Sequence, residues 1–318
     1  MAGRKKIVTI GGGTGSFALL RGLKEYPYDI TAIVTMFDSG GSSGLLRDEH
    51  GVLPPGDVRR CLIALSDGEQ EETLRKLFNF RFKNGGSLKG HSFGNILLTA
   101  LKDILGSDEK AIKEASALLK IRGAVLPVSL TQAHICAELE NGETIEGESQ
   151  IDIPKHNGNL RIKKVFLKPP APSHTAVFDA LTDADAIIFG PGDLYTSVIP
   201  NLLVGGIAKT IQKSNAKKIF VLNLFTKWGE TQNFKASDFA RELLRYAGIK
   251  QFDSIIYNDA SISDEALSKY AAERKFPVPI DADIQKYSRA CVSGDLCFRR
   301  DMVRHDSRKL ADIVSRVV

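Results

Sequence analysis

A run of glycines near the N-terminus is the first segment whose residue types could bind a phosphate. It comprises Gly11, Gly12, Gly13, Thr14 and Gly15. A short apolar run precedes it and a helical pattern follows, with Ser16 as the expected helix cap. Glycine backbone can approach an anion closely, and a helix N-terminus offers free N–H groups with a partial positive charge. From Gly13 onward the segment also fits G-x-G-x-x-A, the dinucleotide-binding fingerprint with alanine third.

The next polar segment argues against an ordinary nicotinamide-dependent dehydrogenase. Asp38 stands where a ribose-binding acid would be expected, but it lies 25 residues after Gly13, beyond the usual spacing of about 20. It continues directly into a second glycine–serine loop, which predicts another anion cradle. That loop contains Ser39, Gly40, Gly41, Ser42, Ser43 and Gly44. The sequence has no G-x-x-x-x-G-K-[ST], which excludes a P-loop nucleoside triphosphatase.

Two further groups of polar residues are expected near these loops. His91, Ser92 and Asn95 precede an apolar helical pattern, so His91 could contact phosphate, transfer a proton or simply support a helix cap. Other polar residues follow two later apolar strands, at the sheet edge where open α/β sheets bind ligands. They are Gly190, Pro191, Gly192, Asp193, Tyr195, Thr196 and Ser197 after one strand, and Asn223, Glu230 and Thr231 after the next.

Three aspartates lie among the proposed anion cradles: Asp38, Asp57 and Asp193. Carboxylates beside phosphates often recruit Mg²⁺, but they could also bind sugar hydroxyls or cap helices, so no metal ligand is assigned. Asp38 and Asp57 are the candidate catalytic residues, which would hold Mg²⁺ or activate an acceptor. The remaining histidines show no metal-ligand spacing.

The order of the elements predicts how these loops are positioned. The chain opens strand–loop–helix–strand, with a second strand over 31–37, a loop over 38–57 and four helical patterns up to residue 119. Short strands and an Asn141-Gly142 hairpin turn follow over approximately 123–168, and alternating strands and helices then return. We predict a single α/β domain over 1–318, with a Rossmann-like, doubly wound, mostly parallel sheet and a β-rich insertion or subdomain.

Composition narrows the class of protein. The 318 residues are 43% hydrophobic and 25% charged, as in ordinary globular proteins. Four cysteines without a CxxC pair indicate no disulfide framework, and no apolar run reaches the roughly 18 residues of a membrane span. The net charge is +5, and the basic and acidic residues are interspersed, without the basic block typical of nucleic-acid binding. We expect a cytoplasmic protein that binds a small molecule and that binds neither nucleic acid nor a membrane.

Together the loops resemble the CofD-like superfamily and, within it, the YvcK-type gluconeogenesis factor branch. The similar stretches are 11–15, 40–47, 54–65, 90–101, 125–128, 190–204 and 229–231. The resemblance implies a homodimer that binds UDP-sugars and is linked to carbon flux and cell shape. It also implies that Tyr270 and Arg304 help to hold a nucleotide sugar. The related CofD enzymes transfer a phospholactyl group to a deazaflavin with Mg²⁺.

Two residues depart from this branch. Ser39 replaces the second of two adjacent aspartates, which weakens a two-carboxylate metal site, and Asp193 replaces a serine beside the proposed phosphate cradle. We therefore expect a nucleotide-sugar-binding regulatory protein without turnover. The alternatives are a transferase of phosphorus-containing groups that uses a nucleoside diphosphate-linked donor, and an NAD(P)-dependent oxidoreductase.

Overall fold

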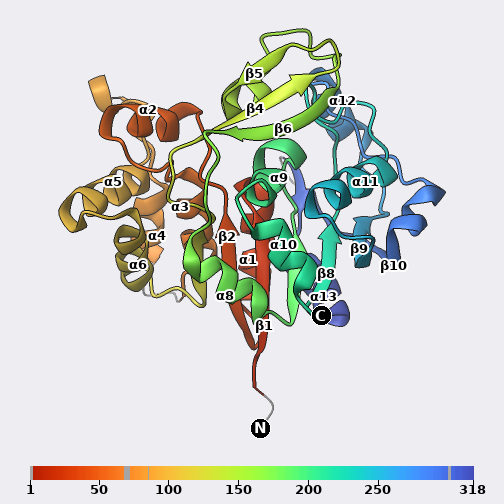
Figure 1. The fold of residues 1–318 in the computed structure, drawn as a ribbon, viewed down its shortest axis with the longest axis horizontal. Helices are drawn as coiled ribbons and strands as arrows, with labels where there is room; N and C mark the ends of the chain where they lie inside the picture. The colour runs from red at the N-terminus through yellow and green to blue at the C-terminus, as the bar shows by residue number, and fades with distance from the viewer. Residues whose placement is uncertain (1–2, 68–71, 85, 300–301) are drawn as a thin grey trace.

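A seven-stranded parallel sheet forms the centre of the protein in the computed structural model (Figure 1). The structure describes residues 3–67, 72–84, 86–299 and 302–318. The strands are β1 (Lys5–Gly11), β2 (Tyr28–Val34), β3 (Ala124–Pro127), β7 (Ala186–Phe189), β8 (Lys217–Val221), β9 (Phe252–Asn258) and β10 (Ser288–Gly294). Their order is β10-β9-β8-β7-β1-β2-β3, and every neighbouring pair is parallel. The order therefore reverses between β1 and β7, and the predicted doubly wound sheet is confirmed.

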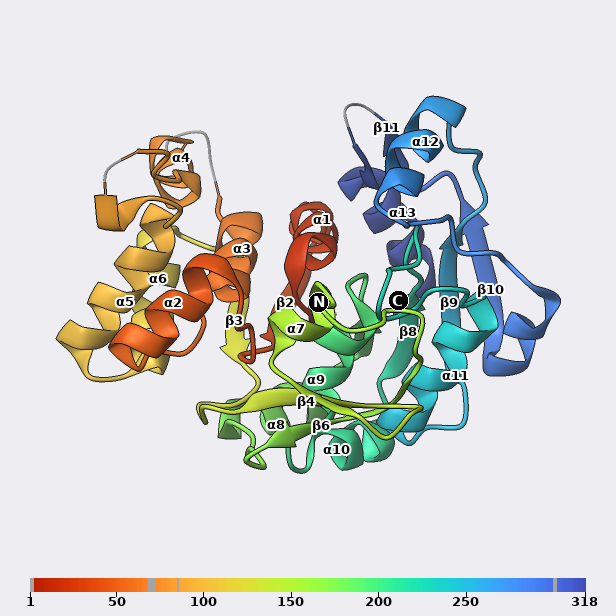
Figure 2. The same cartoon turned by 90° about the horizontal axis from the view of Figure 1, so that it is seen from above.

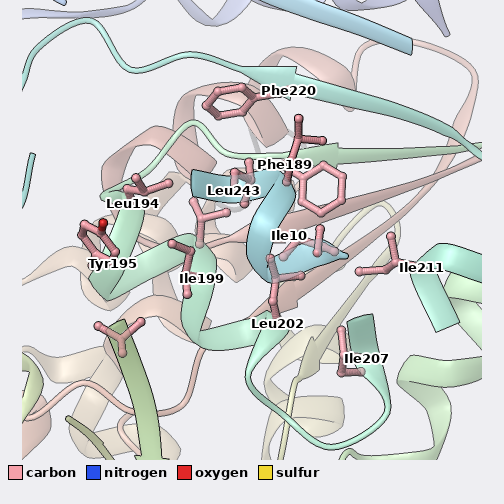
Figure 3. Packing of buried hydrophobic residues seen from close by; sticks show 14 of the residues in the cluster. Ile10, Phe189, Leu194, Tyr195, Ile199, Leu202, Ile207, Ile211, Phe220 and Leu243 are labelled. Atoms are coloured by element: carbon pink, nitrogen blue, oxygen red, sulfur yellow. The ribbon is translucent and has the colours of Figure 1, made fainter. Parts of the chain in front are cut away.

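Helices cover both faces of this sheet because its strands are apolar on both faces. Alternate residues of β1 enter different cores: Ile7 belongs to one cluster, Val8 and Ile10 to the other. The Ile7 face is covered by α1 (Gly13–Leu23), α3 (Gly56–Leu65) and α13 (Ser307–Val317). The Ile10 face is covered by α8 (Thr175–Thr182), α9 (Ile199–Leu202), α10 (Ile207–Lys213) and α11 (Ala236–Ala247). Figure 3 shows Ile10 and Phe189 packed in this second core with Tyr195, Ile199 and Leu202.

A helical region connects β2 to β3. It contains α2 (Gly41–His50), α3, α4 (Glu72–Asn79), the short 3₁₀ helix η2 (Gly86–Leu88), α5 (Phe93–Leu105) and α6 (Asp108–Leu118). The expected loop over 38–57 was wrong in its first half, because α2 occupies it. The first turn of α2 is glycine- and serine-rich and has no apolar periodicity, which made its sequence look like a loop.

The β-rich segment forms a separate antiparallel sheet at the carboxyl edge of the main sheet (Figure 1). It consists of β4 (His134–Leu139), β5 (Thr144–Glu146) and β6 (Ile162–Lys168), and the helix α7 (Glu148–Asp152) follows β5. Asn141 and Gly142 form the predicted turn between β4 and β5. β3 pairs with β2 in the main sheet, so the antiparallel sheet itself lies within 134–168. Its residues Ile135 and Leu167 share the hydrophobic core of α9, which fixes this sheet to the domain.

The remaining elements complete the second half of the chain. They are the π-helical turn η3 (Leu194–Val198), α12 (Asp264–Ala272), the 3₁₀ helix η4 (Ala282–Tyr287), and the hairpin of β11 (Cys297–Arg299) and β12 (Val303–His305). Gly205 and Gly206, the latter with φ +87°, lie between α9 and α10. The four cysteines, all in the described part, form no disulfide. None of the described helices has the length and apolar character needed to cross a membrane.

Candidate functional site

A cavity of about 590 Å³ lies outside the carboxyl ends of β1, β7 and β8. This is the point where the strand order reverses and where open α/β sheets bind ligands. The cavity brings together four of the segments expected at the site. Its lining includes Gly12, Gly13, Thr14, Gly15, Pro191, Gly192, Asp193, Ser197, Asn223, Phe225, Lys227, Tyr270 and Arg304.

The first glycine loop is the first turn of α1, which begins at Gly13 and not at Phe17 as the expected Ser16 cap implied. Gly13 has φ +68°, a conformation that favours glycine. The backbone N–H of Gly13 donates to Asp57 Oδ1 at 2.9 Å, so this donor is already used. The N–H groups of Thr14 and Gly15 belong to the same first turn and have no partner within the helix. They remain the donors of this loop for an anion.

Asp57 thus connects the starts of α1 and α3. Its carboxylate also accepts a hydrogen bond from Arg60 at 3.1 Å, and the side chain is buried. Burial raises the pKa of Asp57, an effect that the guanidinium of Arg60 opposes. The lining of the cavity, over the described residues, does not include Asp57, so its catalytic role stays a prediction.

The second wall of the cavity is the loop after β7. Gly190 has φ +71°, and Asn223 Nδ2 donates to the carbonyl of Gly192 at 2.8 Å, which holds this loop against the end of β8. Pro191 lies directly over the first turn of α1. A Cβ atom on Gly15 would come within 2.6 Å of the carbonyl carbon of Pro191, so only glycine permits this approach.

Lys227 is a site residue that was not predicted from the sequence. Its ammonium lies 2.6 Å from Asp193 and 3.1 Å from Glu230, and it also pairs with Asp152 of α7. The side chain is only 16% exposed. Lys227 therefore offsets part of the negative charge that Asp193 adds beside the phosphate cradle. No motif marks this lysine, and one of its partners lies 75 positions away in the antiparallel insertion.

Glu230 forms hydrogen bonds with the loop after β7. Its carboxylate accepts hydrogen bonds from the backbone N–H of Tyr195 and the hydroxyl of Thr196, both at 3.1 Å. Burial raises the pKa of Glu230 to about 7, although Lys227 lowers it. Tyr195 is buried and donates to Glu242 at 3.0 Å, while the hydroxyl of Thr231 accepts the backbone N–H of Lys227. These predicted ligand residues lie behind the loop, whereas Ser197 faces the cavity.

An aromatic pair forms the far wall. The rings of Phe225 and Tyr270 stack with centroids 4.3 Å apart and planes 12° apart. The hydroxyl of Tyr270 donates to the carbonyl of Val303 at 3.0 Å and accepts the N–H of the same residue at 3.1 Å. This anchors α12 to the β11–β12 hairpin and places the exposed Arg304 at the rim. The structure thus brings Tyr270 and Arg304 to the cavity.

Ser42, His91 and Asn95 form a second, buried polar cluster between α2 and α5. His91 Nδ1 lies 3.1 Å from Ser42 Oγ, which also accepts a hydrogen bond from Asn95 Nδ2 at 3.2 Å. Asn95 in turn accepts from Arg59, and burial lowers the pKa of Arg59 to about 10. Ser92 caps α5. In the described part of the chain these residues do not line the cavity; they join the helices beside it.

The second glycine–serine loop meets the insertion. Asp38 Oδ1 accepts the N–H of Gly40 at 2.8 Å, and Ser39 Oγ accepts the N–H of Ser149 at 2.9 Å. Ser39, which departs from the family pattern, therefore attaches this loop to α7. The other predicted residues of the loop, Gly41, Ser42 and Ser43, lie in the first turn of α2, and Gly11 ends β1.

Of the three aspartates considered for Mg²⁺, Asp38, Asp57 and Asp193, the structure places Asp193 in a group of carboxylates. Among the described residues, the carboxylates with metal-like spacing are those of Asp152, Asp193 and Glu230, within 4.8 Å of one another. The ammonium of Lys227 already pairs with all three. Because that position is taken by a side-chain cation, this group does not fit Mg²⁺.

Comparison with known proteins is consistent with this geometry. The sequence model of the family described as 2-phospho-L-lactate transferase CofD matches residues 7–297. A gluconeogenesis factor from Bacillus subtilis is 42% identical, and the alignment covers 99% of this chain and 98% of that protein. A putative gluconeogenesis factor from a Nostoc species is 46% identical over 97% of this chain and 68% of its own length.

A solved structure agrees over nearly the whole fold. The crystal structure of protein BH3568 from Bacillus halodurans superposes with a TM-score of 0.93 at 41% identity, covering 98% of this chain and 99% of that one. The matches run through the glycine loops, the insertion and the C-terminal elements. The chain therefore belongs to the CofD family, among the gluconeogenesis factors.

Proposed function

We propose that the protein is a nucleotide-sugar-binding regulator of the gluconeogenesis factor type. The single observation that supports this most is the cavity at the strand-order reversal, which combines backbone donors, four lysine and arginine side chains and an aromatic wall. A diphosphate would accept hydrogen bonds from Thr14 and Gly15 at the start of α1. A nucleoside base would lie toward the stacked rings of Phe225 and Tyr270.

Charge favours a diphosphate over a neutral ligand at this position. Arg304 lies at the rim, and Lys269 and Lys275 also line the cavity, whereas the ammonium of Lys227 is shared among three carboxylates. A guanidinium can contact two phosphate oxygens at once, whereas a lysine acts as a point charge. A UDP-sugar is the ligand we propose, with roles in carbon metabolism and cell shape. We further propose a cytoplasmic homodimer that binds neither nucleic acid nor membrane.

A transferase remains the second candidate, because the matching family model carries the description of a transferase. In that function the same cavity would hold a nucleoside diphosphate-linked donor, and Asp38 or Asp57 would act on the acceptor. Release of nucleoside monophosphate in the presence of a deazaflavin acceptor would support it. Unchanged release by Asp38→Asn would contradict the role of Asp38.

A thermal-shift titration tests the proposal directly. Millimolar UDP-N-acetylglucosamine should raise Tm, and at 100 times Kd the stabilisation should be about 2.7 kcal/mol. NAD and NADP serve as matched dinucleotide controls and should give no comparable shift. A shift with NAD(P) alone would instead favour an oxidoreductase, and no shift with UDP-N-acetylglucosamine would contradict the proposal.

A further inference from the structure

A second cavity of about 930 Å³ continues from the candidate site along α1. The two cavities share Thr14, Arg304 and His305 in their linings. The second one, which we call the α1 trough, is bounded by α1, the start of α13 and the β11–β12 hairpin. In Figure 2, α1 lies between the α2–α6 helices on one side and α12, α13 and β11 on the other.

Arginines line the α1 trough without carboxylate partners. Arg21, Arg75 and Arg308 belong to three different helices, and among the described residues none of their side chains makes a hydrogen bond or an ion pair. Asp306 accepts the N–H groups at the start of α13, and Asp312 accepts the hydroxyl of Tyr26, so neither acid pairs with these arginines. The lining carries more basic than acidic side chains, namely Arg21, Lys24, Arg75, Arg304 and Arg308 against Glu25, Asp306 and Asp312. The concave surface therefore has an excess of positive charge.

The distance along α1 from the glycine loop to Arg21 sets how far a ligand bound at the loop must extend to contact this arginine. Thr14, Ala18 and Arg21 line the same trough, and their spacing of four and three residues places them on one face of α1. Seven residues separate Thr14 from Arg21, a rise of about 10 Å along the helix. A group attached to a diphosphate at Thr14 would extend along this face toward the guanidinium of Arg21.

We propose that the α1 trough receives a distal anionic group of the ligand, a carboxylate or phosphate on the part attached to the diphosphate. The inference rests on the proposed function, and it adds a preference for nucleoside diphosphate conjugates with a negatively charged end over neutral ones. Guanidinium groups without partners recognise carboxylates and phosphates through paired N–H donors. Arg21 and Arg308 are the specificity residues.

Two commercial nucleotides that differ at one carbon test this. UDP-glucose carries CH₂OH at C6 and UDP-glucuronic acid carries a carboxylate, so calorimetric titration of both isolates the distal charge. We expect UDP-glucuronic acid to bind roughly tenfold more tightly, the size of one charge-assisted hydrogen bond. In the double variant Arg21→Gln/Arg308→Gln this ratio should fall to about one, while the affinity for UDP stays unchanged.

Lys113→Gln on the exposed surface of α6 is the control, because it makes the same charge change outside the trough. It should keep the tenfold ratio, and circular dichroism should show that all variants are folded. Equal affinity for the two nucleotides, or a ratio that survives the double variant, would overturn this inference while leaving the proposed function standing. Absence of UDP binding to the wild-type protein would overturn both.

Discussion

Glu148 lies at the start of α7, between the second glycine–serine loop and the carboxylates around Lys227. Burial and the negative charges of Asp38 and Asp152 raise the pKa of Glu148 to about 9, against a smaller opposing effect of Lys227. The protonated form of this carboxyl is therefore favoured in the folded protein.

This shift predicts how stability depends on pH. An acid with a raised pKa binds its proton more tightly in the folded state, so its contribution is complete below about pH 4.5 and is lost as pH rises toward 9. Glu148→Gln keeps the uncharged shape and should flatten the decline of unfolding free energy between pH 7 and 9. Urea denaturation at several pH values measures the unfolding free energy of both proteins. An equal decline with pH in wild type and Glu148→Gln would contradict the raised pKa of Glu148.

Single residues of the site differed in how far they could be predicted. Tyr270 and Arg304 were placed through the resemblance alone, and the structure brings both to the cavity. Lys227 was missed because its role depends on partners distant in sequence, which no local pattern records. Glu230 was predicted as a ligand contact, but its hydrogen bonds lie with the loop itself.

Among the elements, the contact between α1 and the loop after β7 determines the shape of the site. Gly15→Ala should improve intrinsic helix propensity, yet its methyl group would collide with the backbone of Pro191. We expect a net loss of about 1–3 kcal/mol in unfolding free energy, together with weaker nucleotide binding.

Gly205→Ala provides the comparison, because a Cβ there meets its nearest atom at an ordinary 3.5 Å. Chemical denaturation of both variants should show a clear loss only for Gly15→Ala. If the two variants match in stability and affinity, the close approach of the loops does not shape the site.

The elements that were predicted correctly are those with strong local patterns. The strand predicted over 31–37 overlaps β2, and the predicted Asn141-Gly142 turn joins β4 to β5. The start of α1 and the whole of α2 were not predicted, because both begin in glycine-rich turns whose helical form depends on packing with α3 and α5. The strand β10 was also missed; its burial pattern is mixed because it lies at the sheet edge.

At the scale of the whole molecule, the antiparallel insertion and the main sheet share one hydrophobic core. Trp228, the only tryptophan in the sequence, lies against Gly158 in the loop before β6. Its fluorescence therefore reports whether the insertion is docked, while far-UV circular dichroism reports the helices on both faces.

We predict that these two signals change together during urea denaturation, with one midpoint. Loss of the fluorescence signal at lower urea, before the helices unfold, would show that the insertion is an independent unit. Leu167→Ala removes a buried side chain from the shared core. It should lower the urea midpoints of both signals by a similar amount.

The central claim is that the cavity at the strand-order reversal binds a nucleoside diphosphate-linked sugar. Calorimetric titration of UDP-N-acetylglucosamine into wild-type protein and the Arg304→Gln variant tests it most directly, with Lys113→Gln as the matched surface control. We predict saturable binding to wild type and control, and at least tenfold weaker binding to Arg304→Gln because one charged contact to phosphate is lost. No binding to wild type, or equal affinity in all three proteins, would contradict it.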